Sequence, residues 1–121
     1  MAVVLVIEDD DQVRVFAEAI LQEHGHQTLT ARTVQEALAI LKGDAALDLL
    51  FTDLELSDDH ESGLRVAREA TALRPEMSVL YTTGVGVTDA TRALFVERWS
   101  FLAKPYTPHD LITAVANALA N

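Results

Sequence analysis

The chain has no cysteine, only two lysines and no long hydrophobic run. Without cysteine it can form no disulfide, no thiolate metal site and no cysteine nucleophile. Its apolar stretches fall well short of the roughly 20 residues that a membrane-spanning helix needs. The N-terminus also lacks the basic start of a signal peptide. These absences predict a cytoplasmic protein with no membrane segment.

Basic residues are few and scattered. Seven arginines and two lysines stand against 19 acidic residues, which gives a formal net charge of −10. Because an acidic surface is repelled by phosphate backbones, the charge argues against direct nucleic-acid binding. A chain of 121 residues is long enough for one domain with one solid core. We therefore expect residues 1–121 to form a single domain, with no output domain in this chain.

Apolar residues alternate between strand-like and helix-like patterns. The aliphatic run that ends at Ile7 has no polar interruption, which is typical of a strand buried on both faces. Helix signals include Gly25 at a C-cap, a capping-box pattern at Thr33 and Glu36, and a stop at Pro75. Five strands, each followed by a helix, predict an α/β fold with a doubly wound parallel sheet and five helices on its two faces. The later strands are expected at 26–31, 47–52, 77–82 and 100–103, with a helix near Leu94 and Phe95 and the last helix opening at Thr107 and Pro108.

Polar side chains gather where these strands end. Since the strands are parallel, their carboxyl ends share one edge of the sheet, where doubly wound folds bind ligands. Carboxylate oxygens there suit Mg²⁺, which would relieve the repulsion between them. A lysine could pair with a carboxylate or bind a phosphoryl oxygen. The residues concerned are Glu8, Asp9, Asp53, Thr82, Thr83 and Lys104.

Two neighbouring threonines, Thr82 and Thr83, are candidates for the functional hydroxyl. We prefer Thr83 to Thr82, because Gly84 follows it and lets the backbone N–H approach an anion closely. Asp10 and Asp11 are interpreted as acids of the first helical turn, not as ligands.

In this order, the motifs "VLVIEDD", "LLFTDLEL", "VLYTTG" and "FLAKP" resemble the receiver domain of bacterial two-component response regulators. The resemblance covers essentially the whole chain. It implies the flavodoxin-like strand order 2-1-3-4-5.

The resemblance also implies a phosphorylation site. Asp53 would accept a phosphoryl group from a phosphohistidine of a sensor histidine kinase or phosphotransfer protein. Mg²⁺ would be held by Asp9, Asp53, the backbone carbonyl of Glu55 and, through water, Glu8. The chain would then be a signalling protein that catalyses its own phosphorylation, not a turnover enzyme.

Three further residues take roles from the resemblance. Thr83 and Lys104 would bind the phosphoryl oxygens, and Phe101 would be the switch aromatic that turns inward with Thr83. A downstream partner would contact the surface formed by the helix near Leu94, strand 100–103 and the last helix. That surface includes Val96, Trp99 and Tyr106.

Two departures from the family pattern lie after Asp53. Ser57 takes the place of the usual proline, and Gly63 comes about two residues late, so loop 57–63 is longer and more acidic than usual. Glu55 stands where the family modulates phosphoryl lifetime.

Other readings stay open. A receiver-like binding module that is never phosphorylated would act through protein contacts alone. An aspartyl phosphatase of the haloacid-dehalogenase type would use Asp9 and Asp11 of a D-x-D-x-V match, but Asp58 and Asp59 precede Lys104, the reverse of that family's order. The sequence does not separate a stand-alone regulator from a piece of a hybrid kinase, and we expect a monomer or weak dimer.

Overall fold

The computed structural model describes residues 2–56, 61–84, 87, 92–96 and 98–120. One five-stranded sheet organises them, and every neighbouring pair of strands is parallel. The strand order is β2-β1-β3-β4-β5, which confirms the predicted fold class. The strands are β1 (Val3–Ile7), β2 (Gln27–Ala31), β3 (Leu49–Asp53), β4 (Ser78–Thr83) and β5 (Trp99–Ala103); the helices are α1 (Asp11–Glu23), α2 (Val34–Lys42), α3 (Ser62–Leu73) and α5 (Pro108–Ala120).

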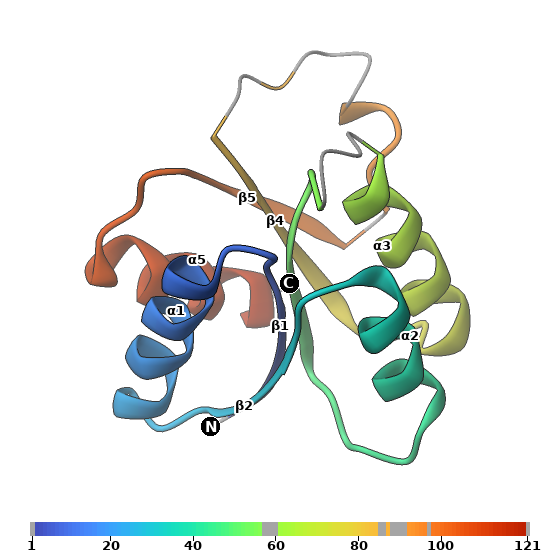
Figure 1. The fold of residues 1–121 in the computed structure, drawn as a ribbon, viewed down its shortest axis with the longest axis horizontal. Helices are drawn as coiled ribbons and strands as arrows, with labels where there is room; N and C mark the ends of the chain where they lie inside the picture. The colour runs from blue at the N-terminus through green and yellow to red at the C-terminus, as the bar shows by residue number, and fades with distance from the viewer. Residues whose placement is uncertain (1, 57–60, 85–86, 88–91, 97, 121) are drawn as a thin grey trace.

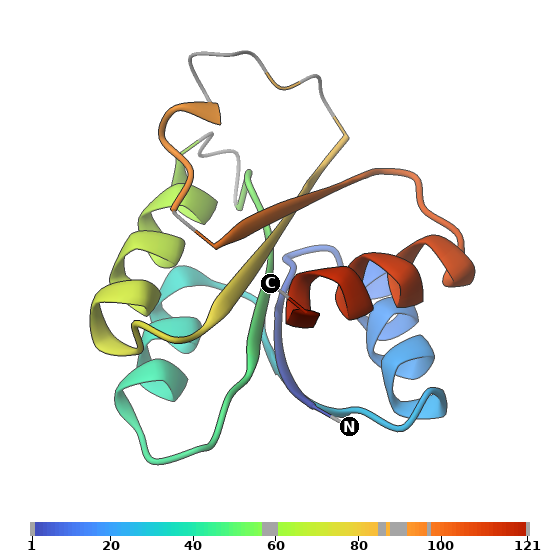
Figure 2. The ribbon, with the colours of Figure 1, turned by 180° about the vertical axis from the view of Figure 1, so that it is seen from behind.

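Helices cover both faces of the sheet. Helices α1 and α5 lie on one side and α2 and α3 on the other (Figures 1 and 2). Strand β1 shows why its sequence is aliphatic throughout, since Leu5 and Ile7 pack on the α2–α3 side while Val4 and Val6 pack on the α1–α5 side. Alternate residues of a strand face opposite ways, so a central strand must be apolar at every position.

Three of the described helices begin with side-chain caps. At α1, Asp10 is the N-cap and not a residue of the first turn as predicted, since its carboxylate accepts from the N–H groups of Gln12 and Val13. The Thr33 hydroxyl accepts a hydrogen bond from the backbone N–H of Glu36, as the sequence pattern predicts. The Glu36 carboxylate returns to the N–H of Arg32, one residue earlier than in a standard capping box. At α5, Thr107 and Asp110 each accept a bond from the other's backbone N–H. These bonds satisfy N–H groups that have no partner within the helix.

Strands β2, β4 and β5 agree with their predicted ranges to within one residue at either end, and two other predicted elements differ more from the structure. The third strand begins two residues later than expected and runs on to Asp53, so the acid is the last residue of β3. The described residues hold four helices where five were predicted. Near Leu94 they show a turn, closed by a bond from the Phe95 N–H to the Arg92 carbonyl at 3.1 Å, and residues 85–86, 88–91 and 97 lie outside the described part. None of the described helices is long and apolar enough to cross a membrane.

Arg74 ties the end of α3 to the end of α2. Its guanidinium donates to three carbonyls, those of Leu41 at 3.2 Å, Gly43 at 3.0 Å and Ala45 at 2.5 Å. Carbonyls at a helix C-terminus have no partner within the helix and carry partial negative charge. The planar fork of arginine can therefore serve several of them at once.

We predict that Arg74→Ala lowers the free energy of unfolding by about 2 kcal/mol, because three carbonyls lose a charged donor. Arg98→Ala is the matched control, since Arg98 is exposed and donates to the Glu76 carbonyl at 2.9 Å. Urea unfolding of both variants measures the difference. Equal stability losses in the two would contradict the capping role of Arg74.

Candidate functional site

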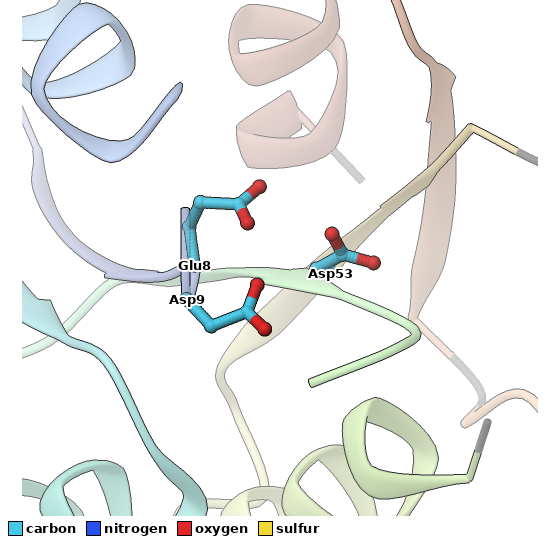
Figure 3. Close-up of side chains that lie close together, drawn as sticks. All are labelled: Glu8, Asp9 and Asp53. Atoms are coloured by element: carbon cyan, nitrogen blue, oxygen red, sulfur yellow. The ribbon is translucent and has the colours of Figure 1, made fainter. Parts of the chain in front are cut away.

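Three carboxylates meet at the carboxyl edge of the sheet. Glu8 and Asp9 follow β1 and Asp53 ends β3, and Figure 3 shows their side chains converging between these two strand ends. One oxygen from each lies within 4.8 Å of the others. Glu8 and Asp53 are only 4% and 6% exposed, whereas Asp9 is exposed. Parallel strands thus bring together residues 45 positions apart, as the sequence pattern predicts.

Lys104 joins these carboxylates from the end of the edge strand β5. Its Nζ atom lies 2.6 Å from Glu8 Oε1 and 2.6 Å from Asp53 Oδ2. The backbone positions it as well, since the Lys104 N–H donates to the Thr83 carbonyl at 3.0 Å. Burial acts to lower the pKa of the ammonium, but its hydrogen bonds to Asp53 and Glu8 outweigh burial and raise the pKa above its usual value.

The buried position of Glu8 disfavours its ionised form. Burial raises the pKa of its carboxyl, and the bonds that it accepts from Lys104 and from the Asp10 N–H only partly offset this. When all groups are ionised, three carboxylates against one ammonium leave two negative charges in a mostly buried space. Hard oxygen ligands with excess negative charge match what Mg²⁺ binds.

Both oxygens of Asp53 have a partner. Oδ2 accepts from Lys104, and Oδ1 accepts from the backbone N–H of Glu55 at 2.9 Å. These two bonds fix the rotation of the carboxylate, so that its free lone pairs face a defined direction. Glu55 is therefore part of the site through its backbone, and the metal-binding role of its carbonyl stays a prediction.

Comparison with known proteins agrees with this geometry. The family model for the response regulator receiver domain matches residues 4–116. The chain belongs to this family.

Several relatives carry a similar domain within a longer protein. The chain is 33% identical over 116 residues to the response regulator protein PilR of Pseudomonas aeruginosa, covering 95% of this chain and 25% of that protein. It is 28% identical over 120 residues to the sensor kinase CckA of Brucella abortus, covering 98% of this chain and 12% of that protein. The crystal structure of a response regulator receiver protein from Sinorhizobium medicae superposes with a TM-score of 0.87 at 28% identity, covering 98% and 94% of the two chains. The chain thus spans about a quarter of the length of the first curated relatives it matches.

The start of α3 is docked directly on the backbone beside Asp53. The Ser62 hydroxyl accepts from the Leu56 N–H at 2.7 Å and donates to the Leu56 carbonyl at 3.2 Å. Gly63 donates its N–H to the Leu54 carbonyl, and a Cβ atom built on Gly63 would lie 2.1 Å from the Asp53 carbonyl oxygen. Only glycine allows so close an approach.

This contact went unpredicted, although the sequence held a signal for it. The glycine that comes late relative to the family pattern is the residue at which helix and strand touch. A Ser-Gly pair directly before an apolar helical run could have indicated it. Residues 57–60, which include Ser57 in the proline position and form most of the lengthened loop 57–63, lie outside the described residues.

The predicted switch residues, Phe101 and Thr83, lie on the neighbouring strands β5 and β4. Phe101, half-buried, packs on the α2–α3 side and is opposite Tyr81 in register. Tyr81 is fully buried, stacks on Phe95 with ring centroids 4.2 Å apart, and accepts a bond from the Val96 N–H. Thr83, two residues after Tyr81, is buried at the end of β4.

Tyr106 lies apart from the other residues of the predicted partner surface. Val96 and Trp99 pack on the α2–α3 side, but Tyr106 packs on the α1–α5 side, against Phe16 and Phe51. The reason is that Tyr106 lies beyond the end of β5, where the chain turns toward α5. Burial raises the pKa of its hydroxyl to about 12. The residues of the predicted surface thus pack on both sides of the edge strand β5, and the partner contact itself stays a prediction.

We predict that Gly63→Ala destabilises the domain by about 2 kcal/mol or more, because the added methyl group forces α3 away from the end of β3. Gly43→Ala is the control, since a Cβ there meets its nearest neighbour at 3.4 Å. Thermal and urea unfolding of the two variants test this. A Gly63→Ala protein as stable as Gly43→Ala would show that the close approach is not required.

Proposed function

We propose that this receiver domain is switched by phosphorylation of Asp53. The observation that supports this most is the Lys104 ammonium, which touches both Asp53 and Glu8 at 2.6 Å beside a third carboxylate, Asp9. If Lys104 only neutralised Asp53, the site would require neither the second buried acid, Glu8, nor the exposed acid, Asp9. The arrangement fits a nucleophile, a cation site and an anion-binding group placed together.

In the proposed reaction an Asp53 oxygen attacks the phosphorus of a phosphohistidine. A P–O bond forms while the P–N bond breaks, and the departing imidazole nitrogen takes up a proton. The residues mainly contribute positioning and charge, since phosphoryl transfer needs little covalent help. Lys104 and Thr83 bind phosphoryl oxygens, and the Glu55 N–H holds the carboxylate in place.

The donor set of the site suits Mg²⁺. Asp9 and Asp53 would bind it directly with the carbonyl of Glu55, and Glu8 through water. When bound, the cation offsets the negative charge that the carboxylates and the phosphoryl oxygens bring together.

Phosphorylation would change the populations of two conformations. The acyl phosphate no longer presents the carboxylate that Lys104 now pairs with, so Lys104 and Thr83 can shift toward the phosphoryl group and Phe101 can turn inward. The donor would be a sensor histidine kinase or a phosphotransfer protein of the cytoplasm. The downstream partner would contact the α2–α3 side near Val96 and Trp99. Residues 1–121 would act as one receiver domain, with the output elsewhere.

We expect one Mg²⁺-dependent phosphoryl adduct after incubation with a small acyl-phosphate donor, and none in Asp53→Asn, which is nearly isosteric but cannot form an acyl phosphate. Intact-mass spectrometry measures both. Asp11→Asn is the matched control, because Asp11 is an exposed acid of α1 paired with Arg14. Labelling of Asp53→Asn would place the nucleophile elsewhere. No labelling of a folded, Mg²⁺-binding wild type by any phosphohistidine donor would favour the binding module.

Lys104→Ala should keep Mg²⁺ affinity within a few-fold while weakening the phosphorylated conformation, because the carboxylates remain and the phosphoryl oxygens lose a cation. Isothermal titration with Mg²⁺ and NMR spectra of the phosphorylated protein separate the two effects. The chain's other lysine, exposed Lys42 at the end of α2, provides the control Lys42→Ala. Normal switching by Lys104→Ala would reject the assigned role.

A further inference from the structure

The side chain of Thr82 carries a buried hydroxyl that has no hydrogen-bond partner. The residue is 2% exposed, and among the described residues its Oγ1 is the one buried side-chain nitrogen or oxygen atom without a hydrogen-bond partner. Buried hydroxyls are nearly always paired, since an unpaired one loses its bonds to water and gains none. Valine would fill the same volume without that loss, so the hydroxyl here costs stability in the unphosphorylated domain.

The position of Thr82 links it to the phosphoacceptor. Thr82 is the register partner of Asp53 on the neighbouring strand, and its carbonyl accepts from the Leu54 N–H at 2.9 Å. Leu80, two residues before Thr82, packs on the α1–α5 side, and so does Phe51, two residues before Asp53. Since side chains alternate along a strand, Thr82 and Asp53 lie on the same face of the sheet, next to each other.

The number of hydrogen-bond acceptors at this place changes with phosphorylation. In the unphosphorylated domain the Asp53 oxygens already have donors, the Lys104 ammonium and the Glu55 N–H. A phosphoryl group adds three further oxygens, each a strong acceptor. Within the described part of the chain, Thr82 has the only buried side-chain donor that is uncommitted, and it lies beside the residue on which those acceptors arise.

We propose that Thr82 is a positioning residue whose hydroxyl donates a hydrogen bond to the phosphorylated Asp53 side chain. This rests on the proposed phosphorylation of Asp53. The unpaired hydroxyl destabilises the unphosphorylated state, and its pairing stabilises the phosphorylated one. Both effects shift the equilibrium toward the phosphorylated conformation, in addition to whatever Thr83 and Lys104 contribute.

Beryllofluoride with Mg²⁺ tests this, because it adds to a carboxylate and imitates a phosphoryl group. Thr82→Val should raise the midpoint of thermal unfolding without beryllofluoride, yet bind beryllofluoride roughly three- to tenfold more weakly, as loss of one hydrogen bond implies. Thr82→Ser, which keeps the hydroxyl, should bind within about twofold of wild type. A merely structural role would move stability and binding in the same direction.

Thr52→Val is the control for the measurement of thermal unfolding. Thr52 is also a fully buried strand threonine, but its hydroxyl donates to the Asp53 carbonyl at 3.0 Å. Removing this paired hydroxyl should lower the unfolding midpoint, the opposite of the result expected for Thr82→Val. Thr82→Ala replaces the valine variant if the latter does not fold, with the same expectation for binding.

Two outcomes would count against the proposal in different ways. Beryllofluoride binding by Thr82→Val as tight as by wild type overturns the role of Thr82 and leaves phosphorylation of Asp53 standing. A wild type that neither binds beryllofluoride nor becomes labelled by acyl phosphate overturns the proposed function, and the role of Thr82 with it. Asp53→Asn, which should not bind beryllofluoride, confirms that the probe reports on this site.

Discussion

The site depends on one ammonium group shared between two buried carboxylates. Lys104 lies 2.6 Å from both Glu8 and Asp53, and no other described cation pairs with either of them. Two acids this close would repel one another strongly in a space shielded from water. The lysine offsets this repulsion, and the sheet makes the contact possible because the ends of β1, β3 and β5 share one edge. Because Lys104 is shared between Glu8 and Asp53, the site can reorganise when the charge of either carboxylate changes.

Several features of the site reduce stability rather than add to it. Glu8 is buried with a raised pKa, Gly63 leaves no room for a side chain, and the Thr82 hydroxyl has no partner. Natural proteins tolerate such features where function requires them and compensate elsewhere. Here the compensation lies in aliphatic packing on both sides of the sheet and in bonds such as those of Arg74.

The sequence predicted the fold and the convergence of the acids because both follow from local patterns. Alternation of strand and helix signals determines a parallel sheet, and the parallel sheet determines which residues share an edge. The sequence did not predict the contacts between one helix and another or between a helix and the sheet. The three bonds of Arg74 and the docking of Ser62 and Gly63 on β3 depend on how the helices sit on the sheet, which no local signal specifies. The contacts of Tyr106 with Phe16 and Phe51 were likewise not predicted, because the direction of this side chain depends on the turn after β5.

The aromatic residues of the α2–α3 side have an optical consequence. Trp99 is the chain's only tryptophan, it meets the Phe95 ring edge-on at 4.9 Å, and the Arg92 guanidinium lies 5.9 Å from its ring centre. Phe95 in turn stacks on Tyr81, which precedes the two threonines of β4. The domain therefore carries one tryptophan fluorophore, which lies on the side of the sheet where Phe101 packs. The emission spectrum of Trp99 therefore reports on packing and charge on the α2–α3 side of the sheet, separately from the α1–α5 side.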